Sequence, residues 1–415
     1  EPYFAGAVEA VASSGGQIMP PIMGAGAFLM ASFLGLQYRE IMIAAIFPAL
    51  LYYGALFLMV RLRALKTGLK GLNPEDLPTK HEVLSKFYMI APIVGLIAFL
   101  LIGYTPMRAA LLGIGLAWLV SFFNFKPDTT QRQKVIAVIV ALISLALAVF
   151  ITVKPEIFGN IKPGIQFVII GAYMLIASMF NPGMNTREVI DAIEQGAQGI
   201  PLVCVACATA GIVLGAVSLT GIGGKLVGFV ISFAGNMPLL ALVLVMLIAT
   251  LLGMGLPTTG AYILAAALGA PILVKLGFPP IAAHMFVFYY AIISNITPPV
   301  ALAAYAASSI AGSDPNKTGF QAMQLGFLAY VVPFAFCYDP GLLMQGSWAQ
   351  IGWALLSGIG AVFAFAGMWM GYLAAHLNAL MRVLLLVSGV LCLSVWPAST
   401  LAGLVILLAV YFINK

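Results

Sequence analysis

The sequence predicts an all-α integral membrane protein that contains an inverted repeat, two re-entrant helical hairpins and broken transmembrane helices. Three observations predict this fold: an apolar composition, a pair of polar tips that each end in a double proline, and a glycine- and proline-rich break within an apolar helix. Hydrocarbon tolerates irregular backbone only where protein encloses it or a cavity surrounds it. The two tips and the break therefore indicate where this protein binds something polar.

Composition places the chain in a lipid bilayer. Hydrophobic residues make up 62% of its 415 residues and charged residues only 8%, and the mean hydropathy is +1.08. Soluble domains contain about 45–50% apolar and about 25% charged residues. Apolar runs long enough to cross a bilayer recur along the whole sequence. We therefore expect a multi-pass membrane protein with no soluble domain of any size.

The charges lie mainly in loops. The net charge of +6 fits basic cytoplasmic loops better than nucleic-acid binding, so no nucleic-acid partner is expected. Segment 61–86 is the most polar, and its basic excess predicts a cytoplasmic linker. Loop 126–134 is also basic, which places the loop at 154–162 on the external side. Cys204 and Cys207 lie in an apolar stretch and are best explained as small packing residues.

The chain divides into five predicted parts. They are 1–60, a first repeat with hairpin 1 and a following helix; 61–86, the cytoplasmic linker; 87–198, scaffold-type helices and a connector; 199–346, a second repeat with a broken helix and hairpin 2; and 347–415, C-terminal transmembrane helices. In the third part, spans are expected at about 87–105, 108–124, 135–153 and 163–181. Residues 185–198 follow as an amphipathic surface helix capped by Asn185 or Thr186, or else as a plain solvated connector.

An internal repeat relates the two hairpins. A single shift in residue number, which we call the repeat offset, takes Pro20 and Pro21 to Pro298 and Pro299. Further matched pairs are Pro2 with Pro280, Ile18 with Ile296 and, after a short insertion in the second copy, Pro48 with Pro333 and Tyr53 with Tyr338. Such weak symmetry between interrupted apolar segments is typical of secondary transporters. The counterpart of the break at 253–260 would precede Glu1, so we expect the first repeat to be incomplete at its front.

Each tip combines side-chain oxygens with unpaired backbone groups. The first tip offers Ser13, Ser14, Gly15, Gly16, Gln17, Met19 and Pro20, and the second offers Ser294, Asn295, Thr297 and Pro298. Because proline suits the first position of a helix, we expect the proline pairs to begin the returning arms, whose N–H groups attract a carboxylate. Carbonyls at the end of the entering arms suit a small cation such as sodium. Gly15 and Gly16 of the first tip are expected to let the backbone turn without strain.

The break at 253–260 offers the same chemistry. Gly253 and Gly255 are predicted to unwind the helix, Pro257 to restart it, and Thr258 and Thr259 to supply hydroxyl ligands. Glycine and proline are also common in transmembrane helices without any binding role. The combination of the break with two paired tips favours a binding role.

Glu9 and His284 are ionisable residues within the entering arms of the hairpins. Such residues are functional candidates in a membrane, but neither has a counterpart in the other repeat, which favours a structural role. The sequence shows no paired carboxylates, no Ser–His–Asp set and no metal-spaced His or Cys cluster. We therefore expect neither enzymatic activity nor an organic cofactor.

Four segments together resemble the large membrane (M-type) subunit of tripartite ATP-independent periplasmic (TRAP) transporters. They are FAGAVEAVASSGGQIMPPIMGA, GMGLPTTGAYILAAALGAPILVKLG, AHMFVFYYAIISNITPPVALAAYAASSIAG and VVPFAFCYDPGLLMQG. The sequence is similar in particular to the fused-permease form that works with TAXI-type binding proteins. The resemblance covers about residues 1–346 and is specific at both hairpins.

The resemblance implies a sodium-driven, elevator-type importer in a bacterial or archaeal cytoplasmic (inner) membrane. Its expected partners are a periplasmic substrate-binding protein, a small membrane subunit that is separate or fused, and an organic acid (carboxylate) as substrate. Carried over onto this chain, both tips and the break hold Na⁺ as the coupling ion, with substrate between the tips. The side chains expected to coordinate sodium are Ser13, Gln17, Thr258, Ser294, Asn295 and Thr297.

The alternative interpretation is a membrane channel or a non-transporting membrane scaffold subunit. A channel is expected to repeat one pore-lining set around symmetric subunits. This chain instead carries two paired, non-identical hairpins, which favours an importer. Since no basic residue lies convincingly at either tip, the sequence does not identify the acid.

Overall fold

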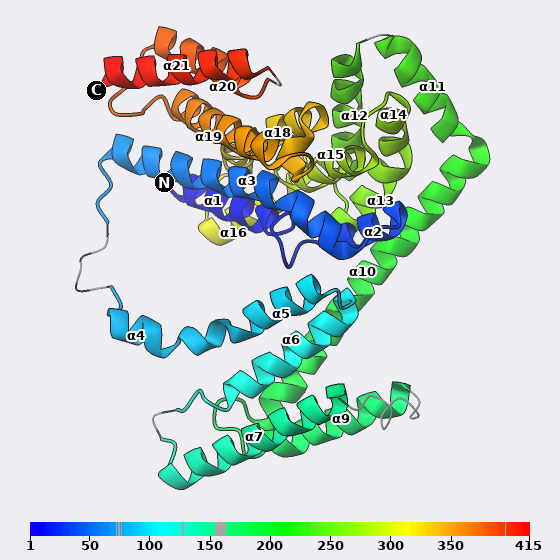
Figure 1. Ribbon diagram of the computed structural model, residues 1–415, viewed down its shortest axis with the longest axis vertical. Helices are drawn as coiled ribbons and strands as arrows, with labels where there is room; N and C mark the ends of the chain where they lie inside the picture. The colour runs from blue at the N-terminus through cyan, green and yellow to red at the C-terminus, as the bar shows by residue number, and fades with distance from the viewer. Residues whose placement is uncertain are drawn as a thin grey trace. The chain divides into compact units, whose positions relative to one another are not determined.

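The computed structural model describes residues 1–71, 73, 75, 77–126, 128–153, 163–235, 237–394 and 396–415. The loop at 154–162, predicted to be external, lies outside the described residues. The described residues form helices and turns, with one isolated bridge between Tyr372 and His376, so the predicted all-helical class is confirmed (Figure 1). The chain packs as two compact units, residues 1–71 with 203–415, and residues 72–202.

Several helices are long and apolar enough to cross a membrane. Within the described ranges five meet both conditions, namely Tyr38–Lys66, Thr258–Lys275, Pro315–Tyr338, Trp348–Met370 and Pro397–Asn414. A sixth span results if Cys207–Val217 and Ile222–Ala234, which meet at a bend of 72°, are counted together. These helices agree with the predicted multi-pass membrane protein.

The first unit begins with the predicted first repeat. Its helices are α1 (Pro2–Gly15), α2 (Ala25–Leu34) and α3 (Tyr38–Thr67). A capping box between Gln37 and Glu40 starts α3, and Gly68, with φ of 66°, ends it in the left-handed conformation that favours glycine. The helix therefore extends beyond residue 60, the predicted end of the first part, and includes the first residues of the predicted linker.

The rest of the first unit contains the second repeat and the C-terminal helices. The elements are α11 (Ile222–Ala234), α12 (Pro238–Gly253), α13 (Thr258–Leu268), α14 (Ala270–Lys275), α15 (Pro280–Ile293), η3 (Ser294–Ile296), α16 (Leu302–Ala311), α17 (Pro315–Leu325), α18 (Phe327–Tyr338), η4 (Pro340–Leu343), α19 (Trp348–Met370), α20 (Ala379–Cys392) and α21 (Pro397–Asn414). The last three lie within 347–415, the part predicted to hold the C-terminal helices.

The helix boundaries repeat with the offset found in the sequence. Helices α1 and α15 each have 14 residues, and the repeat offset takes both the first and the last residue of α1 onto those of α15. Helices α2 and α16 each have 10 residues and differ from the same offset by one position. Each ends at a left-handed glycine, Gly35 or Gly312. Further along each copy, α3 and α18 both contain a buried internal proline, Pro48 or Pro333.

The two hairpins pack crosswise. Helix α1 packs against α16, and α2 packs against α15, so each entering arm meets the returning arm of the other copy (Figure 1). Helix α15 is further covered by α12, α13 and α18. The large apolar side chains of its middle, including Phe286 and Phe288, are consequently fully buried.

The C-terminal helices pack in sequence onto the first repeat. Helix α19 lies against α3 and α20, and α20 lies against α21. Two basic side chains bind the carboxyl end of α19: Lys66 Nζ donates to Met370 O at 2.8 Å, and Arg382 Nε donates to Met368 O at 2.9 Å. Cations at this end of a helix interact favourably with its dipole.

The second unit contains helices of different lengths. They are α4 (Lys80–Ser85), η2 (Phe87–Ile90), α5 (Ala91–Ile102), α6 (Pro106–Ser121), α7 (Gln131–Val153), α9 (Pro163–Ser178) and the beginning of α10 (Thr186–Thr220). Trp118 and Phe122 form part of its core, and Trp118 Nε1 donates to Ser178 Oγ at 2.9 Å. Asn185 caps α10, because its Oδ1 accepts from Glu188 N at 2.9 Å. The predicted boundary between 198 and 199 falls inside this continuous helix.

Candidate functional site

Both hairpin tips are turns of similar length in which the proline pairs lie outside the helices. Helix α2 begins at Ala25 and α16 at Leu302, several residues after the prolines. The prediction that the prolines begin the returning arms is therefore wrong. The chain needs further residues to reverse direction, and Met23 and Ala301 complete the reversal with φ of 38° and 33°.

The same backbone contacts close both turns. Met23 N donates to Met19 O at 3.2 Å, and Ala301 N donates to Thr297 O at 3.1 Å. The repeat offset takes the donor and the acceptor of the first hydrogen bond onto those of the second. The peptide bond between the two prolines is cis at both tips. The repeat detected in the sequence thus extends to individual backbone groups.

A tyrosine hydroxyl fixes the second proline of each pair. Tyr38 Oη donates to Pro21 O at 2.8 Å, and Tyr305 Oη donates to Pro299 O at 2.7 Å. The two tyrosines occupy different positions in the two copies, since Tyr38 begins α3 whereas Tyr305 lies in α16. The equivalent carbonyls therefore accept hydrogen bonds from side chains that are not related by the repeat.

The second tip contacts the broken helix. Asn295 Nδ2 donates to Thr258 Oγ1 at 3.3 Å, across the junction between α12 and α13. A Cβ atom on Gly253 would lie 2.5 Å from Ser294 Oγ, so glycine at this position lets the break approach the tip without displacing the Ser294 side chain. Gly255 has φ of 79°, which agrees with its predicted role in unwinding the helix.

The hydroxyl groups of the second tip already donate hydrogen bonds to backbone carbonyls. Ser294 Oγ donates to Ala291 O at 2.8 Å, and Thr297 Oγ1 donates to Ile293 O at 2.7 Å. Thr297 Oγ1 also pairs with the hydroxyl of Tyr330 from α18. A donated proton leaves the oxygen lone pairs of a hydroxyl free to accept or to coordinate. Asn295 donates through Nδ2 to Thr258, Ala291 and Ile292, and no hydrogen bond to its Oδ1 is seen among the described residues.

The first tip is held differently. Ser13 Oγ donates to Glu9 Oε1 at 2.8 Å. Tyr52 and Tyr53 of α3 donate to Val11 O and Ala12 O at 2.7 and 2.8 Å, in the last turn of α1. These tyrosines fix the end of the entering arm rather than the turn.

The glycines of the first tip do not have the role expected of them. Gly16 has φ of −57°, a helical value that any residue adopts, and Gly15 ends α1. A Cβ atom on Gly15 would lie 2.3 Å from Cε1 of Tyr52. Gly15 is therefore required by the packing of the Tyr52 ring and not by the turn. The left-handed residue of the turn is Met23.

The remaining predicted residues lie in the turns and in the first turn of α13. Ser14 is buried, Gln17 accepts from Gly24 N through its backbone oxygen at 2.8 Å, and Pro257 occupies the N-cap of α13 ahead of Thr258 and Thr259. Sequence reasoning missed Tyr52 and Tyr330. The repeat did not indicate Tyr330: in the alignment after the insertion, which pairs Pro48 with Pro333, its counterpart in the first copy is Ala45.

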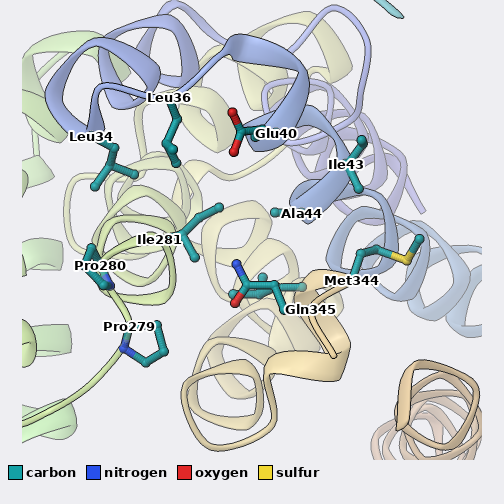
Figure 2. A pocket seen from close by; sticks show the side chains of 11 residues that line it. Leu34, Leu36, Glu40, Ile43, Ala44, Pro279, Pro280, Ile281, Met344 and Gln345 are labelled. Atoms are coloured by element: carbon teal, nitrogen blue, oxygen red, sulfur yellow. The ribbon is translucent and has the colours of Figure 1, made fainter. Parts of the chain in front are cut away.

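A cavity of about 520 Å³ lies away from the tips. The end of α2, the start of α3, the start of α15 and the turn after η4 form its walls, which are the ends of these arms opposite the tips. Figure 2 shows Glu40 and Gln345 as the polar side chains among mostly apolar ones. Because none of its described lining residues belongs to the predicted site, this cavity does not mark the site.

The groups at the two tips are mainly neutral oxygens in the part of the chain that the structure describes. Over these residues no group of three or more His, Cys, Asp or Glu could hold a metal ion. The hydroxyl, amide and backbone oxygens at the tips are hard ligands, as is the Glu9 carboxylate beside Ser13 at the first tip. Hard oxygen ligands suit sodium better than they suit a transition metal.

The family comparison covers these same segments. The family model described as "Tripartite ATP-independent periplasmic transporter, DctM component" matches residues 1–155 and, in a second match, residues 126–351. The chain belongs to the DctM family. It is thus the large membrane component of a TRAP transporter, and this family is a transporter component rather than an enzyme family. No curated protein and no solved structure gave a match.

Membership in the DctM family also confirms part of the expected assembly. A DctM component of a TRAP transporter is expected to associate with a periplasmic binding protein and a small membrane subunit. The apolar helices described above agree with a multi-pass membrane protein.

Proposed function

We propose that this DctM component is the permease of a sodium-coupled secondary transporter that imports an organic acid delivered by a periplasmic binding protein. The observation that carries the proposal is the contact of the second tip with the broken helix, through Asn295 and Thr258. Irregular backbone at membrane depth is tolerated where it lines a site.

The second tip provides the cation site of the proposal. Asn295 Oδ1, Thr258 Oγ1 and the hydroxyl oxygen of Ser294 come from segments that contact one another. Neutral oxygens can bind a monovalent ion such as Na⁺ without the large desolvation penalty of a buried pair of carboxylates. The repeat offset takes Gln17 to Asn295, so Gln17, with the hydroxyl of Ser13 four residues before it, supplies side-chain oxygens for a second site at the first tip.

The returning arms provide the carboxylate site of the proposal. Helix α16 begins at Leu302 after the left-handed Ala301, and α2 begins at Ala25 after Gly24. The first N–H groups of a helix have no partner within it, and together with the helix dipole they attract an anion. This arrangement needs no basic side chain at either tip.

The hairpin packing fits an elevator mechanism. Because α1 packs against α16 and α2 against α15, the two hairpins form one interlocked group around the tips. We propose that the hairpins are re-entrant and related by an inverted repeat, and that this group moves as one body. The fused form with a TAXI-type binding protein, and the inner membrane as its location, rest on the sequence resemblance.

Uptake into proteoliposomes tests the proposal. The purified transporter, with its cognate binding protein loaded with organic acid, is expected to accumulate the acid only with an inward sodium gradient. Asn295→Ala should raise the sodium concentration for half-maximal uptake about tenfold, which corresponds to about 1.4 kcal/mol. Ser309→Ala removes an exposed hydroxyl on α16. It is the matched control and should leave the sodium concentration for half-maximal uptake unchanged.

Two results would contradict the proposal. Uptake that is indifferent to sodium and to the binding protein would support the channel alternative instead. Equal sodium dependence of Asn295→Ala and Ser309→Ala would remove Asn295 from the coordination set.

A further inference from the structure

Three helices of the first unit end at one place. Lys66, in the last turn of α3, donates to Met370 O at the end of α19 at 2.8 Å. Asn414, the last residue of α21, accepts from Ala374 N at 3.2 Å and from Ala375 N at 2.8 Å. These two residues lie in the connection between α19 and α20. The ends of α3, α19 and α21 and the start of α20 therefore lie together, on the side where Figure 1 marks the C-terminus.

Two basic side chains face one small space at this end. Arg382 Nε donates to Met368 O at 2.9 Å, in the last turn of α19. A Cβ atom on Gly371 would lie 3.5 Å from Lys66 Nζ and 3.7 Å from Arg382 Nε. Residue 371 is the left-handed glycine that ends α19, so it places no side chain in this space. We call Lys66 and Arg382 the basic pair.

The basic pair carries an excess of positive charge. The ion pairs that the structure describes involve other basic residues. The carboxyl end of α19 contributes only about half an elementary negative charge, against two full positive charges. Arg382 also lies in the first turn of α20, where the helix dipole disfavours a cation. An anion beside Gly371 would balance this excess.

The hydrogen bonds to α19 hold the basic pair in place without exhausting its donors. A lysine ammonium has three N–H groups, and an arginine guanidinium has five in a planar fork. In the described part of the chain, each member of the pair donates to one carbonyl of α19. Arg382 does so through Nε, and the fork of its Nη groups has the geometry that binds two phosphate oxygens. The pair therefore suits a phosphate group.

An apolar face continues from the basic pair along α20. Leu386 and Val390 follow Arg382 at intervals of four residues, so they lie on its side of the helix. They are 40% and 57% exposed. Helix α3 leads into segment 61–86, whose basic excess predicts the cytoplasmic side, where the leaflet is rich in anionic lipids. A phosphate site that adjoins an exposed apolar face favours a phospholipid over free phosphate.

We propose that Lys66 and Arg382 bind the phosphate of an anionic phospholipid whose acyl chain lies along Leu386 and Val390. The excess charge of the pair selects an anionic lipid over a zwitterionic one, although both contain phosphate. The bound lipid contacts α3 of the first repeat and α20 of the C-terminal helices, so it strengthens the junction between them. The proposal depends neither on sodium coupling nor on the transported substrate.

Lipid titration of the purified transporter, followed by native mass spectrometry, tests the proposal. The probes are dioleoylphosphatidylglycerol, dioleoylphosphatidylcholine, which has the same acyl chains, and inorganic phosphate as a competitor. The transporter should bind the glycerol lipid about tenfold more tightly than the choline lipid. Inorganic phosphate at the concentration of the lipid should not displace it. Arg382→Gln and Lys66→Gln should each lower the preference about fivefold.

Two further variants control the measurement. Lys275→Gln removes an exposed cation at the end of α14 and should leave the preference unchanged. Arg382→Lys keeps a cation for the α19 carbonyl but loses the fork. It should unfold at the wild-type temperature and still lower the preference about threefold.

Three results would overturn the proposal. Equal affinity for the two lipids would mean that the basic pair does not select an anion. An equal loss of preference in Lys275→Gln and Arg382→Gln would reduce the effect to the overall charge of the protein. Displacement of the glycerol lipid by inorganic phosphate would assign the site to a free anion and not to a lipid.

Discussion

The first and second hairpin tips share their backbone and differ in what surrounds it. Both turns close through the same hydrogen bond, from Met23 to Met19 and from Ala301 to Thr297. The second tip, however, meets the broken helix through Asn295, whereas the end of the first arm is held by tyrosines of α3. The repeat thus preserves the path of the chain, while the packing that supports each tip has diverged.

Alanine substitutions at Gly15 and Gly253 should give the largest difference in stability between the tips. Gly15→Ala should destabilise the protein by about 3 kcal/mol, because Cβ meets the ring of Tyr52, which its hydroxyl bond to Val11 holds in place. Gly253→Ala should cost about 1–2 kcal/mol, since the small Ser294 side chain can rotate. Thermal unfolding in detergent measures both.

Gly54→Ala is the control for these substitutions. Gly54 lies within α3 and has open space where a Cβ would be placed, so alanine should be neutral or stabilise the helix by up to about 1 kcal/mol. If Gly15→Ala is no more destabilising than Gly253→Ala, the Tyr52 ring does not fix the first tip.

The hydroxyl of Tyr330 should act on the second tip alone. Tyr330→Phe and Tyr53→Phe should each destabilise the protein by about 1 kcal/mol through a lost hydrogen bond. In double-mutant cycles with Thr297→Val, we expect a coupling energy of about 0.5–1 kcal/mol for Tyr330 and about zero for Tyr53. Equal coupling for the two tyrosines would contradict the contact between Tyr330 and Thr297.

Removing the hydroxyls that donate to the proline carbonyls should have the smallest effects on stability, and the effects at the two tips should be the most similar. Tyr38→Phe and Tyr305→Phe each remove a donor from the second proline of a pair, so each should lower stability by about 0.5–1.5 kcal/mol. Unfolding curves recorded side by side would show the difference between the two variants. A difference above about 1 kcal/mol would mean that the two turns are not equivalent.

Much of the fold followed from the sequence because membrane helices are marked by long apolar runs and by proline and glycine. The repeat offset predicted both hairpins and the matched helix ends of α1 and α15. The position of the prolines within the turns did not follow, since proline suits both the start of a helix and a turn. The end of α3 at Thr67 was missed because basic residues near a helix end resemble a polar loop.

The candidate site could be predicted in part. Asn295, Ser294, Gly253 and Thr258 were chosen from two segments that lie well apart in the sequence, and the structure brings them together. The supporting tyrosines could not be predicted, because a tyrosine in an apolar helix looks like any other large core residue. Only the three-dimensional packing shows that Tyr52 reaches Val11 and that Tyr330 reaches Thr297.

The left-handed residues of the two turns combine backbone strain with a buried side chain. Met23 and Ala301 adopt a conformation that glycine adopts more readily, at a difference of roughly 1–2 kcal/mol. Both side chains are buried, at 5% and 0% exposure. Both turns thus carry a buried side chain at the position where glycine would relax the backbone. The interior around each turn is filled by the residue that also carries the strain.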